Sequence, residues 1–311
     1  MNNWTKPGKF RLIVILGPTA SGKTELAARL AHKISGEIIS ADSRQVYRRM
    51  TIGTGKDLED YTIDGTPVPF HLIDIAEPGY EYNVFEFLKD FRNAFNTINE
   101  HGKIPVLCGG SGMYIDAVVN GYKMKTINTD PDLMEALQTK SDDELREILK
   151  HSGTLHNTTD LTDRVRMIRA ILIPKETKSE EIETSPLPDF DPVLIGINFN
   201  RDQLRKRITE RLEKRIQNGM IKEVEQLLKE GLTPGQLKFY GLEYRYITSY
   251  LESEISYDEM FRLLNIAIHQ FSKRQMTWYR KMEREGKQIH WIDGTLGIDE
   301  KIRLSMDLIN N

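Results

Sequence analysis

The feature that most constrains the fold is a short apolar run followed at once by a glycine-rich octapeptide. Residues 11–16 (RLIVIL) predict a buried strand, and residues 24–34 repeat Leu26, Leu30 and Ile34 every four positions, which predicts a helix. The residues between them fit the pattern G-x-x-x-x-G-K-[ST]: Gly17, Pro18, Thr19, Ala20, Ser21, Gly22, Lys23 and Thr24. Strand, glycine-rich turn and helix in this order predict a phosphate-binding loop, in which backbone amides and Lys23 bind phosphate oxygens and the Thr24 hydroxyl can hold Mg²⁺.

The same alternation of strand and helix continues along the first 121 residues. Gly36 is expected to end the first helix, and residues 37–42, 71–75 and 104–108 predict further strands, with a helix over 84–99. This order predicts an α/β fold with a P-loop NTPase-like parallel sheet flanked by helices.

A polar, mostly helical stretch interrupts this pattern after Gly121. Ser141 and Glu144 have the spacing of a capping box, and residues 175–189 predict a mobile surface loop. Residues 193–199 predict a strand again, and the remainder is predicted to be helical, with a final helix over 267–284. We therefore predict a discontinuous core domain, residues 1–122 and 191–311, with a helical insertion domain at 123–190.

Composition narrows the class of protein. The chain has 311 residues, one cysteine (Cys108) and a net charge of −3, so an intramolecular disulfide and a thiolate metal cage are excluded. The first residues lack the apolar core of a signal peptide, and no early apolar run could span a bilayer. We expect a cytoplasmic protein without a membrane partner. The near-neutral net charge at first argues against a nucleic-acid partner. Net charge does not show how charge is distributed, however, and residues 201–215 are locally basic.

The phosphate loop alone leaves the ligand open. The guanine-reading motif Asn-Lys-x-Asp is absent from the sequence, and Asp74 is the only strand-end acid that resembles a second Mg²⁺ ligand. The residues therefore leave two hypotheses, a small-molecule kinase and a transferase that uses a diphosphate as leaving group.

Two further motifs are expected at the carboxyl edge of the sheet. Asp42 ends the second predicted strand within residues 39–47 (ISADSRQVY), where it could act as a catalytic base or equally as a helix N-cap. Residues 108–114 (CGGSGMY) follow another strand, and such a glycine-rich turn is more often architecture than a ligand loop.

Taken together, six motifs in order resemble those of the tRNA dimethylallyltransferases: GPTASGKT, ISADSRQVY, IGTGK (52–56), HLIDI (71–75), PVLCGGSGMYI (105–115) and KRQMTWYRK (273–281). The resemblance spans nearly the whole chain. It implies transfer of a dimethylallyl group from dimethylallyl diphosphate to the exocyclic amine of the adenosine 3′ to the anticodon in tRNA. It also implies Mg²⁺ as the cofactor, and we expect a monomer.

The resemblance assigns roles to individual residues. Thr19 would lie near the bridging oxygen of the diphosphate, Asp42 would accept a proton or a hydrogen bond from the adenine amine, and Arg211 would contact the diphosphate. The metal would be held by Thr24. A larger set would contact the anticodon stem-loop of the tRNA: Asp42, Ser43, Arg44, Gln45, Ser111, Arg164, Arg166, Arg169, Lys273 and Arg274. For Trp278 we favour packing over base stacking.

Two segments depart from the family pattern. Residues 53–57 read GTGKD where many relatives have Gly-Thr-Ala-Lys-Pro, and residues 240–244 read YGLEY in place of the usual Gly-Tyr-Lys-Glu segment. We expect effects on loop stiffness and on RNA contacts, respectively. Besides the kinase, two alternatives remain at this point: prenylation of a free adenine nucleotide, and an RNA-binding module whose phosphate loop is vestigial.

Overall fold

The structure is a computed structural model, and it describes residues 5–6, 9–122, 131–152, 164–172 and 187–310. The chain divides into two compact units, a larger one formed by Met1–Gly121 and Leu187–Asn311 and a smaller one formed by Tyr122–Pro186. In the part of the chain that the structure describes, no helix is long and apolar enough to cross a membrane.

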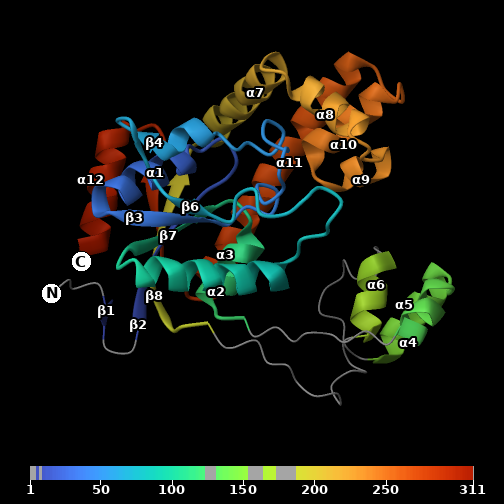
Figure 1. Cartoon of the computed structure of the whole chain (residues 1–311), viewed down its shortest axis with the longest axis horizontal. Helices are drawn as coiled ribbons and strands as arrows, with labels where there is room; N and C mark the ends of the chain where they lie inside the picture. The colour runs from blue at the N-terminus through green and yellow to red at the C-terminus, as the bar shows by residue number, and fades with distance from the viewer. Residues whose placement is uncertain (1–4, 7–8, 123–130, 153–163, 173–186, 311) are drawn as a thin grey trace. The chain divides into compact units, whose positions relative to one another are not determined.

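The larger unit is built on a seven-stranded sheet (Figure 1). Its strands are β1 (Thr5–Lys6), β2 (Lys9–Leu16), β3 (Gly36–Ser40), β6 (Phe70–His71), β7 (Ile104–Gly109), β8 (Phe190–Asn198) and β9 (Ile289–Asp293). The order is β6, β3, β7, β2, β8, β9, with every neighbouring pair parallel, while β1 pairs antiparallel with β2. Because β2 is central, its carboxyl end lies between those of β7 and β8, where ligands of open parallel sheets bind. The predicted fold class is confirmed.

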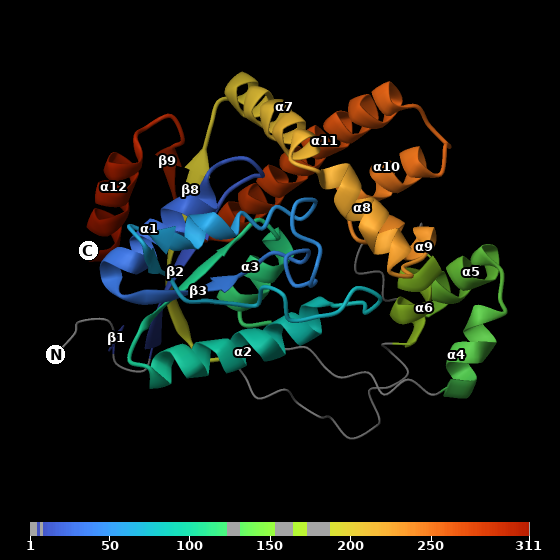
Figure 2. The same cartoon turned by 45° about the horizontal axis from the view of Figure 1, so that its top comes forward.

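Helices cover both faces of this sheet (Figure 2). Ile13 and Ile15 of β2 share one core with Leu26 of α1 (Lys23–Ile34) and Ile309 of α12 (Ile298–Asn310). On the other face lie α2 (Val84–Glu100), whose aromatic rings pack against Phe190 of β8, and α3 (Gly112–Val119). Burial on both faces explains why the strands read as continuous apolar runs.

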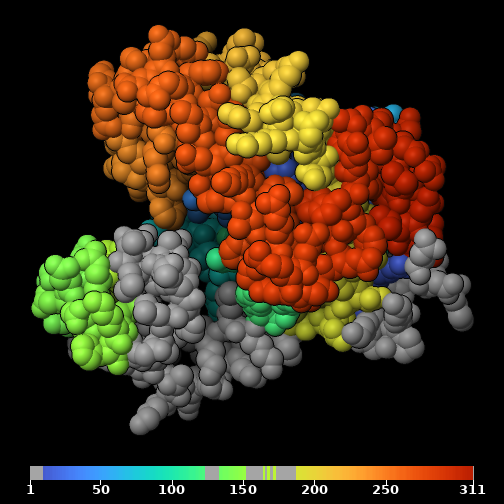
Figure 3. All heavy atoms as spheres, turned by 180° about the vertical axis from the view of Figure 1, so that it is seen from behind, coloured from blue at the N-terminus to red at the C-terminus, as the bar shows by residue number. Residues whose placement is uncertain are grey.

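The later helices of the larger unit form a second core. They are α7 (Arg201–Gln217), α8 (Met220–Lys229), α9 (Pro234–Phe239), α10 (Leu242–Leu251) and α11 (Tyr257–Arg284). Leu204, Ile208 and Leu212 of α7 are buried in this core, together with Tyr47 and Met50 from the loop after β3. The predicted apolar stripe is thus confirmed, and it ties the loop after β3 to the helices. In space-filling view, α7 (yellow) and the C-terminal helices (orange to red) make up much of one face (Figure 3).

The smaller unit has its own core. Its described elements are α4 (Pro131–Gln138), α5 (Asp142–Ser152) and α6 (Arg164–Leu172). Leu145, Leu149, Met167 and Ile171 are buried against one another. The predicted capping box is confirmed, since the Glu144 amide donates to Ser141 Oγ (3.3 Å) and the Ser141 amide donates to Glu144 Oε2 (2.7 Å). The loop predicted at 175–189 falls largely outside the described residues.

Three predictions need correction. The strand predicted over 71–75 is limited to β6 because Leu72 and Asp74 adopt positive φ of 64° and 55°, which interrupts an extended chain. The first helix ends at Ile34 as predicted, but its left-handed C-cap is Ser35 (φ 54°) and Gly36 instead opens β3. The C-terminal remainder is not all helical, because β9 extends the sheet at its edge.

Candidate active site

The phosphate loop connects β2 to α1 at the carboxyl edge of the sheet. Ala20 and Gly22 have φ of 63° and 80°, and Gly22 is the N-cap of α1. Residues 19–24 line a cavity of about 690 Å³. Since the first amides of a helix carry partial positive charge, the loop has the geometry of an anion site. Gly17 and Pro18, also predicted to bind the diphosphate, belong to the loop but not to the cavity lining.

Two buried side chains of α11 hold the phosphate loop in place. Gln275 Oε1 accepts from the Thr19 amide (2.9 Å), and its Nε2 donates to the Gly110 carbonyl (2.8 Å). The Tyr279 hydroxyl donates to the Gly17 carbonyl (3.1 Å). Sequence reasoning placed Gln275 in a motif without assigning it a role, because its two partners are 256 and 165 positions away.

Asp42 lies in the same cavity as the phosphate loop. Its Oδ1 accepts from the Arg44 amide (2.9 Å), so the side chain closes a turn rather than capping a helix. The Ser43 amide donates to Ser111 Oγ (3.0 Å), which brings the loop after β3 and the loop after β7 together. Arg44 and Gln45 also line the cavity.

The glycines after β7 serve packing. A Cβ on Gly109 would lie 2.1 Å from the Ala41 carbonyl oxygen, and a Cβ on Gly112 would lie 2.5 Å from the ring of Trp278. Within residues 109–112, only Ser111 lines the cavity. Trp278 is half-buried against Gly112, with Lys281 Nζ 5.4 Å from its ring centroid. Gly109 therefore lets the end of β7 approach the loop after β3, and Gly112 lets α3 approach α11.

Three arginines of α7 reach the cavity from one side of the helix. Arg207 Nε donates to the Ala20 carbonyl (2.9 Å). Arg211 forms an ion pair with Asp57 (2.5 Å), and Arg215 lies 3.7 Å from the same carboxylate. The sequence prediction singled out Arg211, and the structure adds its two neighbours on the same helix face.

The cavity lining has more cations than carboxylates. The basic side chains are Lys23, Arg44, Arg207, Arg211, Lys214, Arg215, Arg245 and Arg274, and the acidic ones are Asp42, Asp57, Asp60, Glu210 and Glu243. Burial lowers the pKa of Lys23 and of Arg215, and it raises the pKa of Asp60 to about 6. Each shift reflects the cost of removing a charge from water. An anionic ligand would offset that cost for the cations.

Some predicted contact residues lie elsewhere. Lys273 is exposed on α11 and does not line the cavity, whereas Arg274 does. Arg164 belongs to the smaller unit, where it forms an ion pair with Asp142 (2.5 Å). The side chains of Arg166 and Arg169 lie outside the described residues.

Sequence reasoning missed several lining residues. They are Asp57, Asp60, Phe239, Arg245 and Phe271. The clearest available signal was the departure from the family pattern at residues 53–57 and 240–244, since both segments contribute to the cavity wall.

The cavity can be tested for its fit to Mg²⁺. Among the residues that the structure describes, no three His, Cys, Asp or Glu side chains are grouped to hold a metal. The Thr24 hydroxyl and the Asp42 carboxylate do line the cavity. Mg²⁺ commonly takes one or two protein oxygens and fills its remaining positions with water and substrate phosphate. These two oxygen ligands therefore fit a Mg²⁺ ion that binds together with a phosphorylated substrate.

Comparison with known proteins gives one consistent answer. A family model described as IPP transferase matches residues 45–282, and another described as isopentenyl transferase matches residues 10–66. The tRNA dimethylallyltransferase 2 of Bacteroides fragilis is 52% identical over 293 residues, covering 94% of this chain and 96% of that protein. The tRNA dimethylallyltransferase 1 of Parabacteroides distasonis is 50% identical over 302 residues, covering 97% of this chain and 98% of that protein.

Solved structures agree with these relatives. The tRNA isopentenylpyrophosphate transferase of Bacillus halodurans is 31% identical with a TM-score of 0.69, covering 96% of this chain and 94% of that one. A eukaryotic dimethylallyltransferase has a TM-score of 0.78 at 23% identity, covering 97% of this chain and 80% of that one, which supports the fold.

Proposed function

The chain belongs to the IPP transferase family of tRNA dimethylallyltransferases, and from this we propose that it prenylates adenosine in tRNA. The donor is dimethylallyl diphosphate, and the acceptor is the exocyclic amine of the adenosine 3′ to the anticodon. The comparisons favour this transferase over the kinase that the phosphate loop alone left open.

One observation carries the proposed chemistry. Asp42, the phosphate loop and Arg211 line a single cavity, although they come from three separate segments of the chain. A base and an anion site must lie this close if a nucleophile is to attack a carbon attached to a diphosphate.

In the proposed reaction, the adenine amine attacks the first carbon of the dimethylallyl group. The new carbon–nitrogen bond forms as the carbon–oxygen bond to the diphosphate breaks, and Asp42 accepts the amine proton. Thr19, Lys23 and Arg211 stabilise the negative charge that develops on the departing pyrophosphate. Thr24 would hold Mg²⁺, which when bound would supply further positive charge beside the diphosphate.

The acceptor base must leave the stacked anticodon loop to reach Asp42. Base flipping is the usual solution for enzymes that modify a base. Ser43, Arg44, Gln45, Ser111 and Arg274 lie where they could read the flipped base and its neighbours. We assign contacts with the anticodon stem-loop to these residues and to the insertion at 123–190. We also propose that the protein acts as a monomer in the cytoplasm, where its tRNA substrate is made.

The test is transfer of a labelled dimethylallyl group to a tRNA transcript in the presence of Mg²⁺. Asp42→Asn should lower kcat by about 100-fold or more, since general base catalysis contributes this much. The control is Asp64→Asn, a carboxylate on the surface outside the cavity, which should behave like the parent.

Two acceptors, tRNA and AMP, and a tRNA-binding assay separate the alternatives. Product on tRNA but not on AMP supports the proposal, and equal product on AMP favours a free-nucleotide prenyltransferase. Salt-sensitive tRNA binding that survives Lys23→Ala, with no product from the parent, would favour an RNA-binding module.

A further inference from the structure

We propose that Asp57 is a fixed counter-ion of the donor site that competes with the diphosphate for Arg211 and Arg215. Asp57 stands where many family members have proline. Its carboxylate pairs with Arg211 Nη2 (2.5 Å) and lies 3.7 Å from Arg215 Nη2. Both arginines line the cavity together with the phosphate loop. The inference rests on the proposed function, because it takes the diphosphate as the ligand of these arginines.

The two arginines need a counter-charge. They lie one helical turn apart on α7, and their side chains are only 30% and 13% exposed. Burial and the charge of Arg211 both lower the pKa of Arg215. Arg215 Nη2 is buried and makes no hydrogen bond with the described residues. Asp57, together with Glu243, therefore offsets the repulsion between the two arginines.

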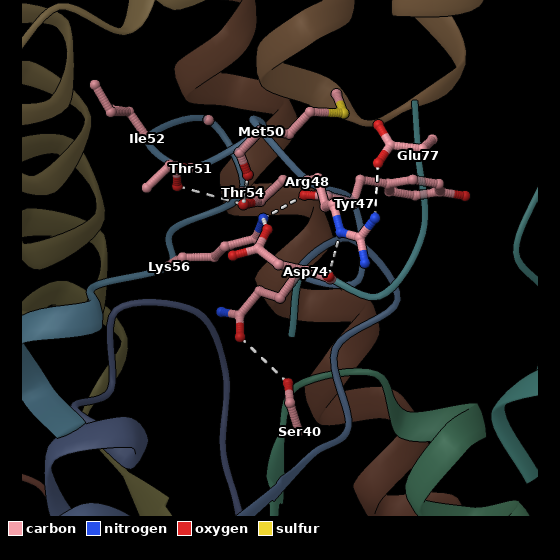
Figure 4. A network of polar contacts seen from close by, with 12 residues as sticks. Ser40, Tyr47, Arg48, Met50, Thr51, Ile52, Thr54, Lys56, Asp74 and Glu77 are labelled. Atoms are coloured by element: carbon pink, nitrogen blue, oxygen red, sulfur yellow. Dashed lines mark hydrogen bonds and ion pairs between the residues drawn. The ribbon is translucent and has the colours of Figure 1, made fainter. Parts of the chain in front are cut away.

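The loop that leads to Asp57 is anchored at two points. The buried Lys56 ammonium donates to the Tyr47 carbonyl and pairs with Asp74 (Figure 4). Earlier in the loop, the carboxylate of Glu223 accepts from three successive amides, those of residues 51–53 (2.7–3.0 Å). The Asp57 carbonyl itself accepts from the Asp60 amide (3.0 Å). Because the backbone is held at these points, the Asp57 carboxylate stays beside the cavity.

A fixed carboxylate affects both the binding of the prenyl donor and the release of pyrophosphate. A diphosphate must share Arg211 and Arg215 with Asp57 and is repelled by it, so donor and pyrophosphate bind less tightly than the cations alone would allow. The physical benefit is release of pyrophosphate, which carries more negative charge than the esterified donor and is therefore repelled more strongly. Asp57 is thus a positioning residue that sets the affinity for the leaving group.

The test is titration calorimetry of the full chain with inorganic pyrophosphate and Mg²⁺. Asp57→Asn should lower the Kd for pyrophosphate by about 10-fold, the order expected for removing one nearby charge. The KM for dimethylallyl diphosphate should fall in the same direction while the KM for tRNA stays unchanged, and inhibition by pyrophosphate should strengthen.

Variants with and without the charge separate electrostatics from folding. Asp57→Ser is a second neutral variant and should also bind more tightly, whereas Asp57→Glu keeps the charge and should resemble the parent. Glu213→Gln removes one charge from an exposed position of α7 outside the cavity and should change nothing. In an Arg211→Gln background, most of the effect of Asp57→Asn should disappear.

Two outcomes would overturn the inference. One is unchanged or weaker pyrophosphate binding by both neutral variants, and the other is an undiminished gain in the Arg211→Gln background. If the parent binds no pyrophosphate and prenylates no tRNA, the proposed function itself fails, which is a distinguishable result.

Discussion

Asp60 illustrates how the fold changes the chemistry of a single residue. Its side chain is half-buried in the cavity wall, where burial first, and then the charge of Asp57, raises its pKa from 3.8 to about 6. The neighbouring acids Asp57 and Glu59 are visible in the sequence, but the largest cause of the shift is burial, which comes from folding.

The shift of Asp60 predicts a pH dependence of stability. The folded state binds the proton of Asp60 more tightly than the unfolded state does. The free energy of unfolding therefore falls as pH rises from about 4 to about 6 and the carboxyl group ionises. Asp60→Asn should remove this loss and make the protein more stable than the parent at neutral pH. Urea unfolding at several pH values in this window measures the effect, and parallel profiles for the two proteins would contradict it.

Among the elements, α11 does the most to position the site. One helix supplies Gln275 and Tyr279, which bond the phosphate loop and the turn after β7 across the sheet edge. The sequence predicted a helix over 267–284 but not these contacts. A sequence pattern shows which face of a helix is apolar, and it does not show which residues that face contacts.

Replacing Gln275 should loosen this connection. Gln275→Leu keeps the size and leaves the Thr19 amide unpaired, at a cost of about 1–3 kcal/mol for a buried group. The Gly110 carbonyl would keep only the longer hydrogen bond from the Tyr279 hydroxyl (3.4 Å). We expect a lower free energy of unfolding together with weaker pyrophosphate binding. Gln270→Leu, at an exposed position of the same helix, is the matched control. Equal stability of the two variants would show that the hydrogen bonds are unimportant.

At the scale of the whole molecule, the chain has separate cores. The smaller unit buries its own apolar side chains and holds α6 to α4 and α5 through Arg164, which donates to the carbonyls of Gln138 (2.8 Å) and Lys140 (2.5 Å) and pairs with Asp142. The resemblance assigned Arg164 to tRNA. Its contacts within the unit favour a structural role.

This structural role predicts a local effect. Arg164→Ala should lower the hydrogen-exchange protection of α4, α5 and α6 by about 1–3 kcal/mol, and leave α2 and α11 unchanged, because units with separate cores open independently. Lys150→Ala, which removes a surface ion pair with Glu147, should have little effect. Unchanged protection with weaker tRNA binding would instead support a direct contact.

The sequence was enough to predict the phosphate loop, the parallel sheet and the family, because these depend on local patterns: an apolar strand, a glycine-rich turn and a helix in fixed order. It did not determine β9 or the break after β6, since backbone conformation at Leu72 and Asp74 is fixed by neighbours distant in the chain. The contacts of Asp57 with Arg211, 154 positions away, and of Gln275 with Thr19 form only in the folded chain and could not be predicted. The reason is physical: charge, burial and hydrogen bonding at the site depend on distances in space, which local periodicity does not specify.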